Sequence, residues 1–229
     1  MSPKQLAFDL TSKPALGRED FYVSPANAQA VAMIEGWQGW PGRKLALIGP
    51  SGAGKTHLVH VWAALSNAQI VPASELKERD IAALAQGHLA VEDVPAIAGD
   101  IAAEEALFHL HNLASAEGRS LLLTAPVPPI RWGLSLPDLM SRMQGTTAVV
   151  VESPDDELLS AVLMKLFADR QLSPSPETLP YLIRHIDRSF EMARRVVAAL
   201  DDAALSQGRE INRKLAGEVI SDLTDNDAS

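Results

Sequence analysis

The sequence predicts an α/β domain built on a five-stranded parallel sheet, followed by a small all-helical domain. Short apolar runs that suit β-strands alternate with longer segments of helical spacing, and this alternation is typical of parallel strands joined by helices. The runs LALIG, LAVE, LLLT and AVVVE are nearly continuous in apolar residues, as expected where helices cover both faces of a sheet. The expected strands lie near residues 44–48, 69–72, 88–92, 120–124 and 147–152.

The expected elements divide the chain into three parts. Residues 1–20 combine prolines, a glycine and charges with scattered apolar positions, which predicts an extended arm. Residues 21–152 contain all the strand patterns and form the α/β domain, whereas residues 153–229 contain only helical patterns. Within the α/β domain, two core-facing helices are predicted from apolar residues at helical spacing: Leu58, Val61, Trp62 and Leu65, then Leu107, Leu110 and Ala114.

Capping signals place the helices of the second domain. Ser153, followed by a proline and two aspartates, predicts a capped helix of about four turns. Ser175 precedes a proline and a glutamate in the same way and predicts a second helix start. A third helical run spans roughly residues 189–206. Gly208 and Asn212 then mark the break before a last helix.

Composition excludes several classes of protein. The chain contains no cysteine, which rules out disulfides, thiolate zinc sites and cysteine nucleophiles. No apolar run approaches the roughly 20 residues that span a bilayer, and the N-terminus lacks the pattern of an export signal. A net charge of −9 opposes non-specific binding to nucleic acid. We therefore expect a cytoplasmic protein without membrane attachment or strong direct nucleic-acid binding.

A complete Walker A motif lies between the first expected strand and a helical pattern. The motif G-x-x-x-x-G-K-[ST] needs glycines so that backbone N–H groups can surround phosphates, a lysine to reach the outer phosphates, and a hydroxyl to ligate Mg²⁺. The strand-loop-helix context confirms the match and predicts binding of ADP or ATP with Mg²⁺. The predicted nucleotide-binding residues are Gly49, Pro50, Ser51, Gly52, Ala53, Gly54, Lys55 and Thr56.

An acidic pair ends the third expected strand, where a P-loop site needs a carboxylate to hold Mg²⁺ and its water. Glu92 is the predicted metal ligand together with Thr56, and Asp93 is the predicted catalytic acid. Two histidine pairs, His57 with His60 and His109 with His111, lack further converging ligands, so we interpret them as structural residues.

These motifs together resemble the AAA+ ATPases, and closer features resemble their DnaA-like branch. In Leu136-Pro137-Asp138-Leu139-Met140-Ser141-Arg142-Met143, a Pro-Asp-Leu precedes a Ser-Arg pair, as in that branch's arginine-finger segment. The resemblance implies that Arg142 reaches the γ-phosphate held by a neighbouring subunit and stabilises charge during hydrolysis. It also implies that Thr124 is the polar sensor 1 residue, that the helical domain is a lid, and that Arg194 is its sensor 2 arginine, with Arg195 as the neighbouring alternative.

The N-terminal arm resembles a sliding-clamp-binding peptide. An extended segment would place a glutamine at a pocket rim while spaced apolar side chains supply contacts. The clamp-binding residues implied are Gln5, Leu6, Phe8 and Leu10, and the partner implied is the DNA polymerase III sliding clamp, its β subunit. By the same resemblance, adenine and ribose lie against the segment that contains Phe21 and Val23.

The resemblance implies a negative regulator of replication initiation that stimulates hydrolysis of ATP bound to DnaA. The chain ends soon after its last helix, whereas DnaA continues into a helix-turn-helix domain, so we expect a regulator rather than the initiator. Glu92 replaces the family's usual aspartate, and the residues after Thr124 lack the family's Asp and Arg, so weak intrinsic ATPase activity is implied.

Other interpretations remain open. The chain could be a self-contained ATPase or helicase loader that works as a homo-oligomer, with Arg142 completing the site of an identical neighbour. It could also be an adaptor whose nucleotide is structural. A P-loop kinase of small molecules is a more distant alternative, against which the helical lid argues. The sequence does not fix the resting nucleotide, ADP or ATP, or the choice between monomer and dimer.

Overall fold

The computed structural model describes residues 22–227 of the chain. In this part of the chain, five parallel strands form one sheet in the order β2-β3-β4-β1-β5. The predicted five-stranded parallel sheet is therefore confirmed. The strands are β1 (Lys44–Ile48), β2 (Gln69–Pro72), β3 (Leu89–Glu92), β4 (Leu121–Ala125) and β5 (Ala148–Val150).

The strand bounds differ slightly from those predicted, most clearly at the edge strand. β3 and β4 each begin one residue later than expected, and β5 ends at Val150 rather than near residue 152. Among the described residues, β5 pairs only with β1, whose last residue is Ile48, so no described strand lies beside the residues after Val150. One further bond, from the Val151 N–H to the Ile48 carbonyl at 2.6 Å, ties the exit of β5 to the start of the phosphate loop.

Helices cover both faces of the sheet, and the buried side chains of the strands alternate between the two layers. α1 and α2 pack with Leu45, Leu47 and Leu122 on one face. α3, α4 and α5 pack with Val91, Leu123 and others on the second face. The bounds are α1 (Ala28–Glu35), α2 (Lys55–Ser66), α3 (Ile81–Leu84), α4 (Ile101–Ala116) and α5 (Pro137–Gln144), with short 3-10 turns at Trp37–Gly39, Pro41–Arg43, Ala73–Glu78, Val94–Ile97 and Pro129–Arg131.

The two predicted helical faces are confirmed with one exception. Leu58, Val61 and Trp62 of α2 are buried, as are Leu107, Leu110 and Ala114 of α4. Leu65 was expected in the same face but is 46% exposed. It lies in the last turn of α2, beyond the apolar cluster that ends on this helix at Trp62, so the core does not reach it.

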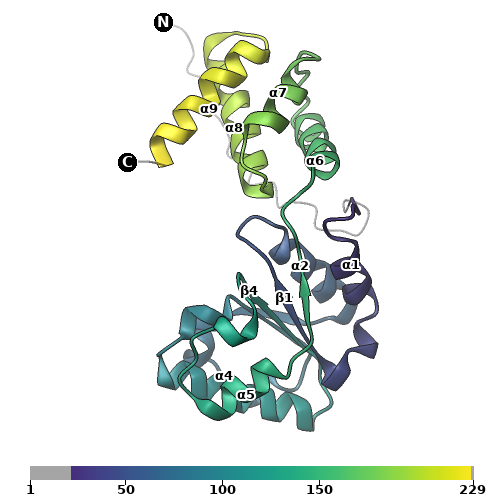
Figure 1. Cartoon of the computed structure of the whole chain (residues 1–229), viewed down its shortest axis with the longest axis vertical. Helices are drawn as coiled ribbons and strands as arrows, with labels where there is room; N and C mark the ends of the chain where they lie inside the picture. The colour runs from purple at the N-terminus through teal and green to yellow at the C-terminus, as the bar shows by residue number, and fades with distance from the viewer. Residues whose placement is uncertain (1–21, 228–229) are drawn as a thin grey trace, which may run out of the picture.

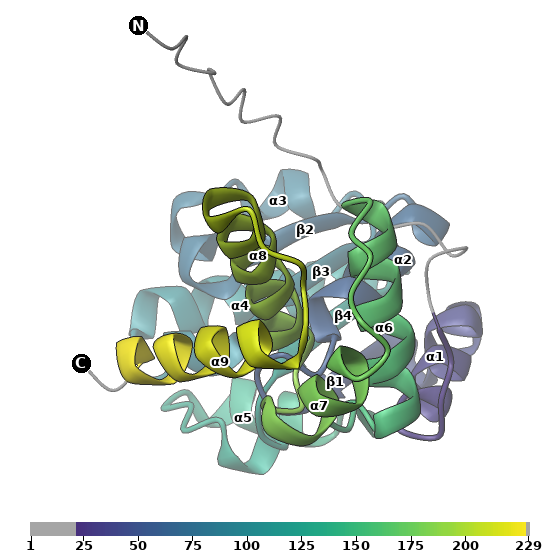
Figure 2. The same cartoon turned by 90° about the horizontal axis from the view of Figure 1, so that it is seen from above.

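The remaining helices form a separate unit with its own apolar core, and we call this unit the lid. Figure 1 shows the lid standing at one end of the α/β domain, and Figure 2 looks down on it. Its core contains Leu163, Leu182, Val196, Val197 and Leu215 among others. Within residues 22–227, no helix combines the length and the apolar character needed to cross a membrane. The lid helices are α6 (Asp156–Asp169), α7 (Thr178–His185), α8 (Phe190–Gln207) and α9 (Arg213–Asp227).

The first two lid helices are capped differently from the prediction. Asp155, not Ser153, is the N-cap of α6, and its carboxylate accepts the Leu158 N–H at 2.8 Å. A carboxylate satisfies the free N–H groups of a first turn and contributes about 1 kcal/mol, which favours this later start. α7 begins at Thr178 after Glu177, and the Ser175 hydroxyl instead pairs with the Thr178 hydroxyl at 2.9 Å.

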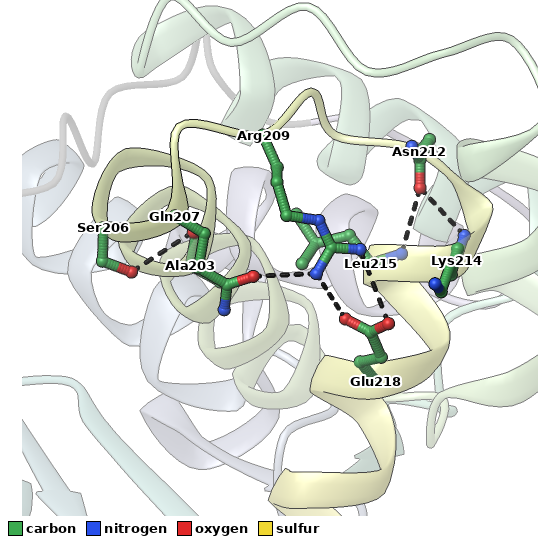
Figure 3. A network of polar contacts seen from close by, with 8 residues as sticks. All are labelled: Ala203, Ser206, Gln207, Arg209, Asn212, Lys214, Leu215 and Glu218. Atoms are coloured by element: carbon green, nitrogen blue, oxygen red, sulfur yellow. Dashed lines mark hydrogen bonds and ion pairs between the residues drawn. The ribbon is translucent and has the colours of Figure 1, made fainter.

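The turn between α8 and α9 follows the predicted break. Gly208 adopts a left-handed conformation with φ +61° and ends α8. The Asn212 side chain accepts the N–H groups of Lys214 and Leu215 at 3.0 and 3.1 Å, so it caps α9. Figure 3 shows Arg209 holding the turn, with its guanidinium 2.7 Å from Glu218 of α9.

Candidate nucleotide-binding site

The predicted phosphate loop connects β1 to α2, at the carboxyl end of the sheet's strands. Ligands of open parallel sheets bind at this end, where helix N-termini also favour anions. Gly52 and Gly54 have φ of +73° and +99°, a region that side chains with a Cβ rarely adopt. At Gly49 a Cβ would lie 2.2 Å from the Val151 carbonyl oxygen. The loop is therefore held in a conformation that these glycines permit.

The lid contacts the loop directly through the start of α8. The Phe190 N–H donates to the Gly52 carbonyl at 2.9 Å. Ser189 is the N-cap of α8, and its side chain lies against Gly52, while the ring of Phe190 lies against Gly54. A change of conformation in the loop is consequently coupled to the position of α8. This contact was not predicted from the sequence, although Ser189 at the start of an expected helix carried a recognisable cap signal.

Lys55 begins α2 with its ammonium group turned back into the loop. Its Nζ donates to the carbonyls of Gly49 and Pro50 at 2.6 and 2.8 Å. Burial lowers the pKa of Lys55, and the carboxylates of Asp93 and Glu92 act in the opposite direction. The lysine is thus already inside the cradle that phosphates would occupy, close to both predicted acids.

The ends of three neighbouring strands bring the other predicted residues together. The Thr56 hydroxyl donates to the Glu92 carboxylate at 2.8 Å, which joins the start of α2 to the end of β3. Asp93 has a left-handed backbone with φ +55°, and its N–H donates to the Thr124 hydroxyl on β4 at 2.9 Å. β3, β4 and β1 are adjacent in the sheet. The structure therefore brings together the residues assigned to the loop, the acidic pair and sensor 1.

The donor set fits Mg²⁺ held together with a nucleotide. Mg²⁺ usually keeps several waters and is bound by one or two protein oxygens plus substrate phosphates. Thr56 and Glu92 supply such oxygens 2.8 Å apart beside the loop. Within residues 22–227, no group of three or more His, Asp or Glu side chains is placed to hold a metal ion without a nucleotide.

Replacing Glu92 by glutamine is expected to weaken Mg²⁺-dependent nucleotide binding by about tenfold. Removing the charge of a group that ligates or orients a metal site commonly costs 10- to 100-fold in metal affinity. ADP would be titrated in the presence of Mg²⁺ and in the presence of a chelator. The variant and wild type should differ in ADP affinity only when Mg²⁺ is present. The exposed Glu78→Gln variant is the matched control. If Mg²⁺ raised the ADP affinity of the Glu92→Gln protein as much as that of wild type, this assignment would be contradicted.

A cavity of about 410 Å³ opens between the loop and the lid. The resemblance implied Arg194 as the sensor 2 arginine, with Arg195 as the neighbouring alternative, and the two lie in different surroundings. Arg195 lines this cavity, whereas Arg194 is exposed and does not. The two are successive on α8, so they point to different faces of the helix. The lining residues are Ser51, Ser153, Asp187, Arg188, Ser189, Glu191, Met192 and Arg195.

The segment expected against adenine and ribose packs beside the lid's first helix. Tyr22 donates its hydroxyl proton to Glu157 of α6 at 2.5 Å. Val23 is 52% exposed and is not among the residues that line the cavity. Phe21 and the predicted clamp-binding residues Gln5, Leu6, Phe8 and Leu10 lie outside the described residues.

Arg142 lies at the opposite end of the sheet from the chain's own loop. It is exposed on α5, and its charge adds to burial in lowering the pKa of Lys44, the first residue of β1. Lys44 in turn lies 2.7 Å from the imidazole Nε2 of His111. The loop follows the last residue of β1, about 13 Å away at the usual rise of a strand. Figure 1 shows α5 at the far end of the α/β domain from the lid. Arg142 is therefore exposed and lies far from the chain's own phosphate loop.

Glu104 of α4 is a fully buried carboxylate that sequence analysis did not single out. Its two oxygens accept backbone N–H groups of Gly99, Ser135 and Leu136 at 2.7 to 3.0 Å. Burial acts to raise the pKa of Glu104, but these hydrogen bonds outweigh it, so the pKa lies below its usual value. Because the partners are backbone groups in other segments, no local sequence pattern announces them.

Acid should remove the stabilising contribution of Glu104. A depressed folded-state pKa means that this contribution is complete above the unfolded value of about 4.3 and is lost as the pH falls through the folded pKa. Glu104→Gln should cost about 2 kcal/mol of the free energy of unfolding at pH 7 and show a smaller loss below pH 4. Urea unfolding at several pH values measures both. Glu105→Gln, exposed on the same helix, should match wild type. If the free energy of unfolding of Glu104→Gln fell with pH in parallel with that of wild type, the expectation would be contradicted.

Comparison with known sequences finds DnaA. The chain is 26% identical over 222 residues to the chromosomal replication initiator DnaA of Cutibacterium acnes, covering 86% of this chain and 43% of that protein. It thus spans less than half the length of this relative. It is also 28% identical over 186 residues to an uncharacterised protein of Haemophilus influenzae, covering 76% of this chain and 79% of that one. No family model matches the chain.

Comparison with solved structures finds the same fold. Domain III of Thermotoga maritima DnaA superposes with a TM-score of 0.77 at 21% identity, over 91% of this chain and 97% of that one. Aquifex aeolicus DnaA bound to AMPPCP gives 0.71 at 16% identity, over 84% and 67%. The FIGL-1 AAA domain in complex with ADP gives 0.63 at 13% identity, over 83% and 76%. The chain therefore has the fold of a DnaA-like AAA+ ATPase domain, with a parallel five-stranded sheet and a helical lid.

Proposed function

We propose that this chain is a negative regulator of replication initiation, comparable to Hda, the DnaA regulatory inactivator. Bound to the DNA-loaded sliding clamp in the cytoplasm, it presents Arg142 to ATP held by DnaA and stimulates hydrolysis of that ATP. The observation that carries the proposal is the position of Arg142, exposed on α5 at the opposite end of β1 from the chain's own phosphate loop. An arginine in this place serves a site on another molecule.

The chain's own loop holds a nucleotide in this proposal, either ADP or ATP. Backbone N–H groups of the loop and the Lys55 ammonium bind phosphate oxygens, and Thr56 and Glu92 hold Mg²⁺, which neutralises phosphate charge when bound. Arg195 approaches the same space from α8, whose first residues already contact Gly52 and Gly54. A bound nucleotide therefore stabilises one arrangement of lid and α/β domain.

Arg142 acts in trans on the triphosphate of DnaA. A guanidinium offers a planar, permanently charged fork of N–H donors that matches phosphate oxygens. Charge accumulates on these oxygens as the terminal phosphoryl group leaves, so a cation placed there stabilises the transition state more than the ground state. Such fingers contribute about 10³- to 10⁵-fold to hydrolysis.

Weak intrinsic turnover follows from the same geometry. Arg142 cannot complete the chain's own site, because it lies at the far end of β1. Glu92 is one methylene longer than the usual aspartate, which shifts the carboxylate relative to Thr56. Thr124 already accepts the Asp93 N–H, so part of its capacity is committed to holding the acidic turn.

The proposed clamp contact uses Gln5, Leu6, Phe8 and Leu10 of the N-terminal arm. A short extended peptide with alternating apolar anchors supplies modest affinity and fits a groove on a partner. Tethering to the clamp raises the local concentration of Arg142 near DnaA, so stimulation becomes conditional on clamp loading.

The alternative function is a self-contained AAA+ ATPase or helicase loader acting as a homo-oligomer. The same exposed position of Arg142 favours it, since an identical neighbour could receive the side chain. In that case the isolated protein should show steady-state ATP turnover that rises with its concentration.

The deciding experiment measures ATP hydrolysis by purified DnaA with this protein, with and without clamp loaded on DNA. A variant with Gln5, Leu6 and Phe8 replaced by alanine is measured beside wild type. Stimulation that requires the clamp and disappears in the variant supports the regulatory function. No stimulation under any condition would refute it and leave the self-contained ATPase in front.

A further inference from the structure

The finger helix α5 has no cap of its own. Its N-cap residue is Leu136, whose apolar side chain cannot accept an N–H, and its first residue is Pro137. A helix start of this kind leaves N–H groups that need partners from elsewhere. Leu139 and Met143 bury the inner face of α5, and the helix has only eight residues, a length that depends on tertiary contacts for its stability.

Glu104 of α4 supplies the missing partner. Its carboxylate accepts the Leu136 N–H at 2.7 Å and the Ser135 N–H at 2.9 and 3.0 Å. The same group accepts the Gly99 N–H at 2.9 Å, which ties it to the loop before α4. Hydrogen bonds to a buried charge are strong and short, and the Glu104 carboxylate also lies at the N-terminus of α5, the positive end of the helix dipole.

A second positive charge lies near the other end of α5. Lys44 contacts the imidazole Nε2 of His111 at 2.7 Å, and the nearby Arg142 adds to burial in lowering the pKa of Lys44. Arg142 and Lys44 carry like charges that repel, so this end of α5 gains no electrostatic anchor from them.

We propose that Glu104 is the positioning residue of the arginine finger: its buried carboxylate fixes the start of α5 and thereby aims Arg142 at the partner's triphosphate. The proposal rests on the proposed function. Catalysis by a finger depends on placement, because a displacement of about 1 Å can cost on the order of 100-fold in rate. The chain's own nucleotide site does not use Glu104, so its binding stays unaffected.

The chemistry of the anchor predicts an order among variants. Glu104→Gln keeps the shape but presents an NH₂ group to N–H donors, so at least one hydrogen bond is lost and one contact becomes repulsive. Glu104→Asp keeps the charge on a side chain one methylene shorter. Activity should therefore fall in the order wild type, Glu104→Asp, Glu104→Gln. Glu105→Gln, next in sequence but exposed, is the matched control.

The test titrates each full-length variant against DnaA loaded with ATP, in the presence of clamp on DNA. For Glu104→Gln we expect a maximal stimulated rate about tenfold lower, with an unchanged half-saturating concentration and unchanged ADP affinity. A general loss of structure would instead lower ADP affinity and raise the half-saturating concentration. That result, or a maximal rate equal to wild type, would overturn the proposal.

A second measurement separates this proposal from the proposed function. Amide hydrogen exchange of the isolated protein should be faster within residues 138–143 of Glu104→Gln and unchanged in α2 and α8. Unchanged exchange in α5 would overturn the anchoring role even if DnaA is stimulated. If wild type itself gives no stimulation, the regulatory function is refuted. Faster amide exchange confined to α5 of Glu104→Gln would still show that Glu104 anchors this helix, although without the catalytic consequence.

Discussion

Arg142→Ala is expected to reduce stimulation of DnaA-bound ATP hydrolysis by at least about 10³-fold. The substitution removes the cation that stabilises transition-state charge and leaves the fold intact, because the side chain is exposed. It should also relieve repulsion on Lys44, so stability should not decrease. Single-turnover hydrolysis of ATP preloaded on DnaA, with saturating clamp-bound protein, measures the effect.

Two control variants test whether the lost stimulation is specific to the guanidinium of Arg142. Arg142→Lys keeps the charge but lacks the planar fork, so it should recover only a small part of the rate. Arg184→Ala removes an exposed arginine of the lid and should behave as wild type. Full stimulation by Arg142→Ala would exclude the finger and favour an adaptor that works through another surface. Affinity for ADP should be the same in all of these proteins.

Much of the fold was readable from the sequence because its signals are local. A strand buried on both faces must be apolar throughout, and the four nearly continuous apolar runs became β1, β3, β4 and β5. The loop at residues 49–56 was predicted because its glycines and lysine meet constraints set within eight residues. Where two local signals competed, as with Ser153 and Asp155 at the start of α6, the sequence interpretation chose the wrong cap.

Contacts between distant segments could not be predicted in the same way. Glu104 is surrounded in sequence by alanines and a second glutamate, and two of its three partners lie 31 and 32 residues further along. The meeting of α8 with the loop joins residues more than 130 positions apart. The sequence interpretation preferred Arg194 to its neighbour Arg195, but only the packing of α8 decides which of them lines the cavity. Each case depends on tertiary placement rather than on residue type.

Gly54→Ala is expected to weaken nucleotide binding by roughly 100-fold or more. Gly54 has φ +99°, where a residue with a Cβ costs about 1–3 kcal/mol. The new methyl would also lie 2.7 Å from Cε2 of Phe190, so either the ring or the loop must move. A loop that relaxes out of its binding conformation is competent for only part of the time, and the apparent affinity falls by that fraction. ADP titration with Mg²⁺ measures the change.

A double-mutant cycle with Phe190→Ala separates the two causes. Removing the ring abolishes the contact but leaves the backbone strain, so Gly54→Ala combined with Phe190→Ala should bind ADP more tightly than Gly54→Ala alone and more weakly than Phe190→Ala alone. Gly87→Ala, where a methyl meets open space, should bind as wild type does. Full recovery in the double variant would show that contact with the lid, not the left-handed backbone, makes glycine necessary at this position. No recovery would assign the whole effect to the backbone of the loop, and α8 would then be a neighbour of the nucleotide site without control over it.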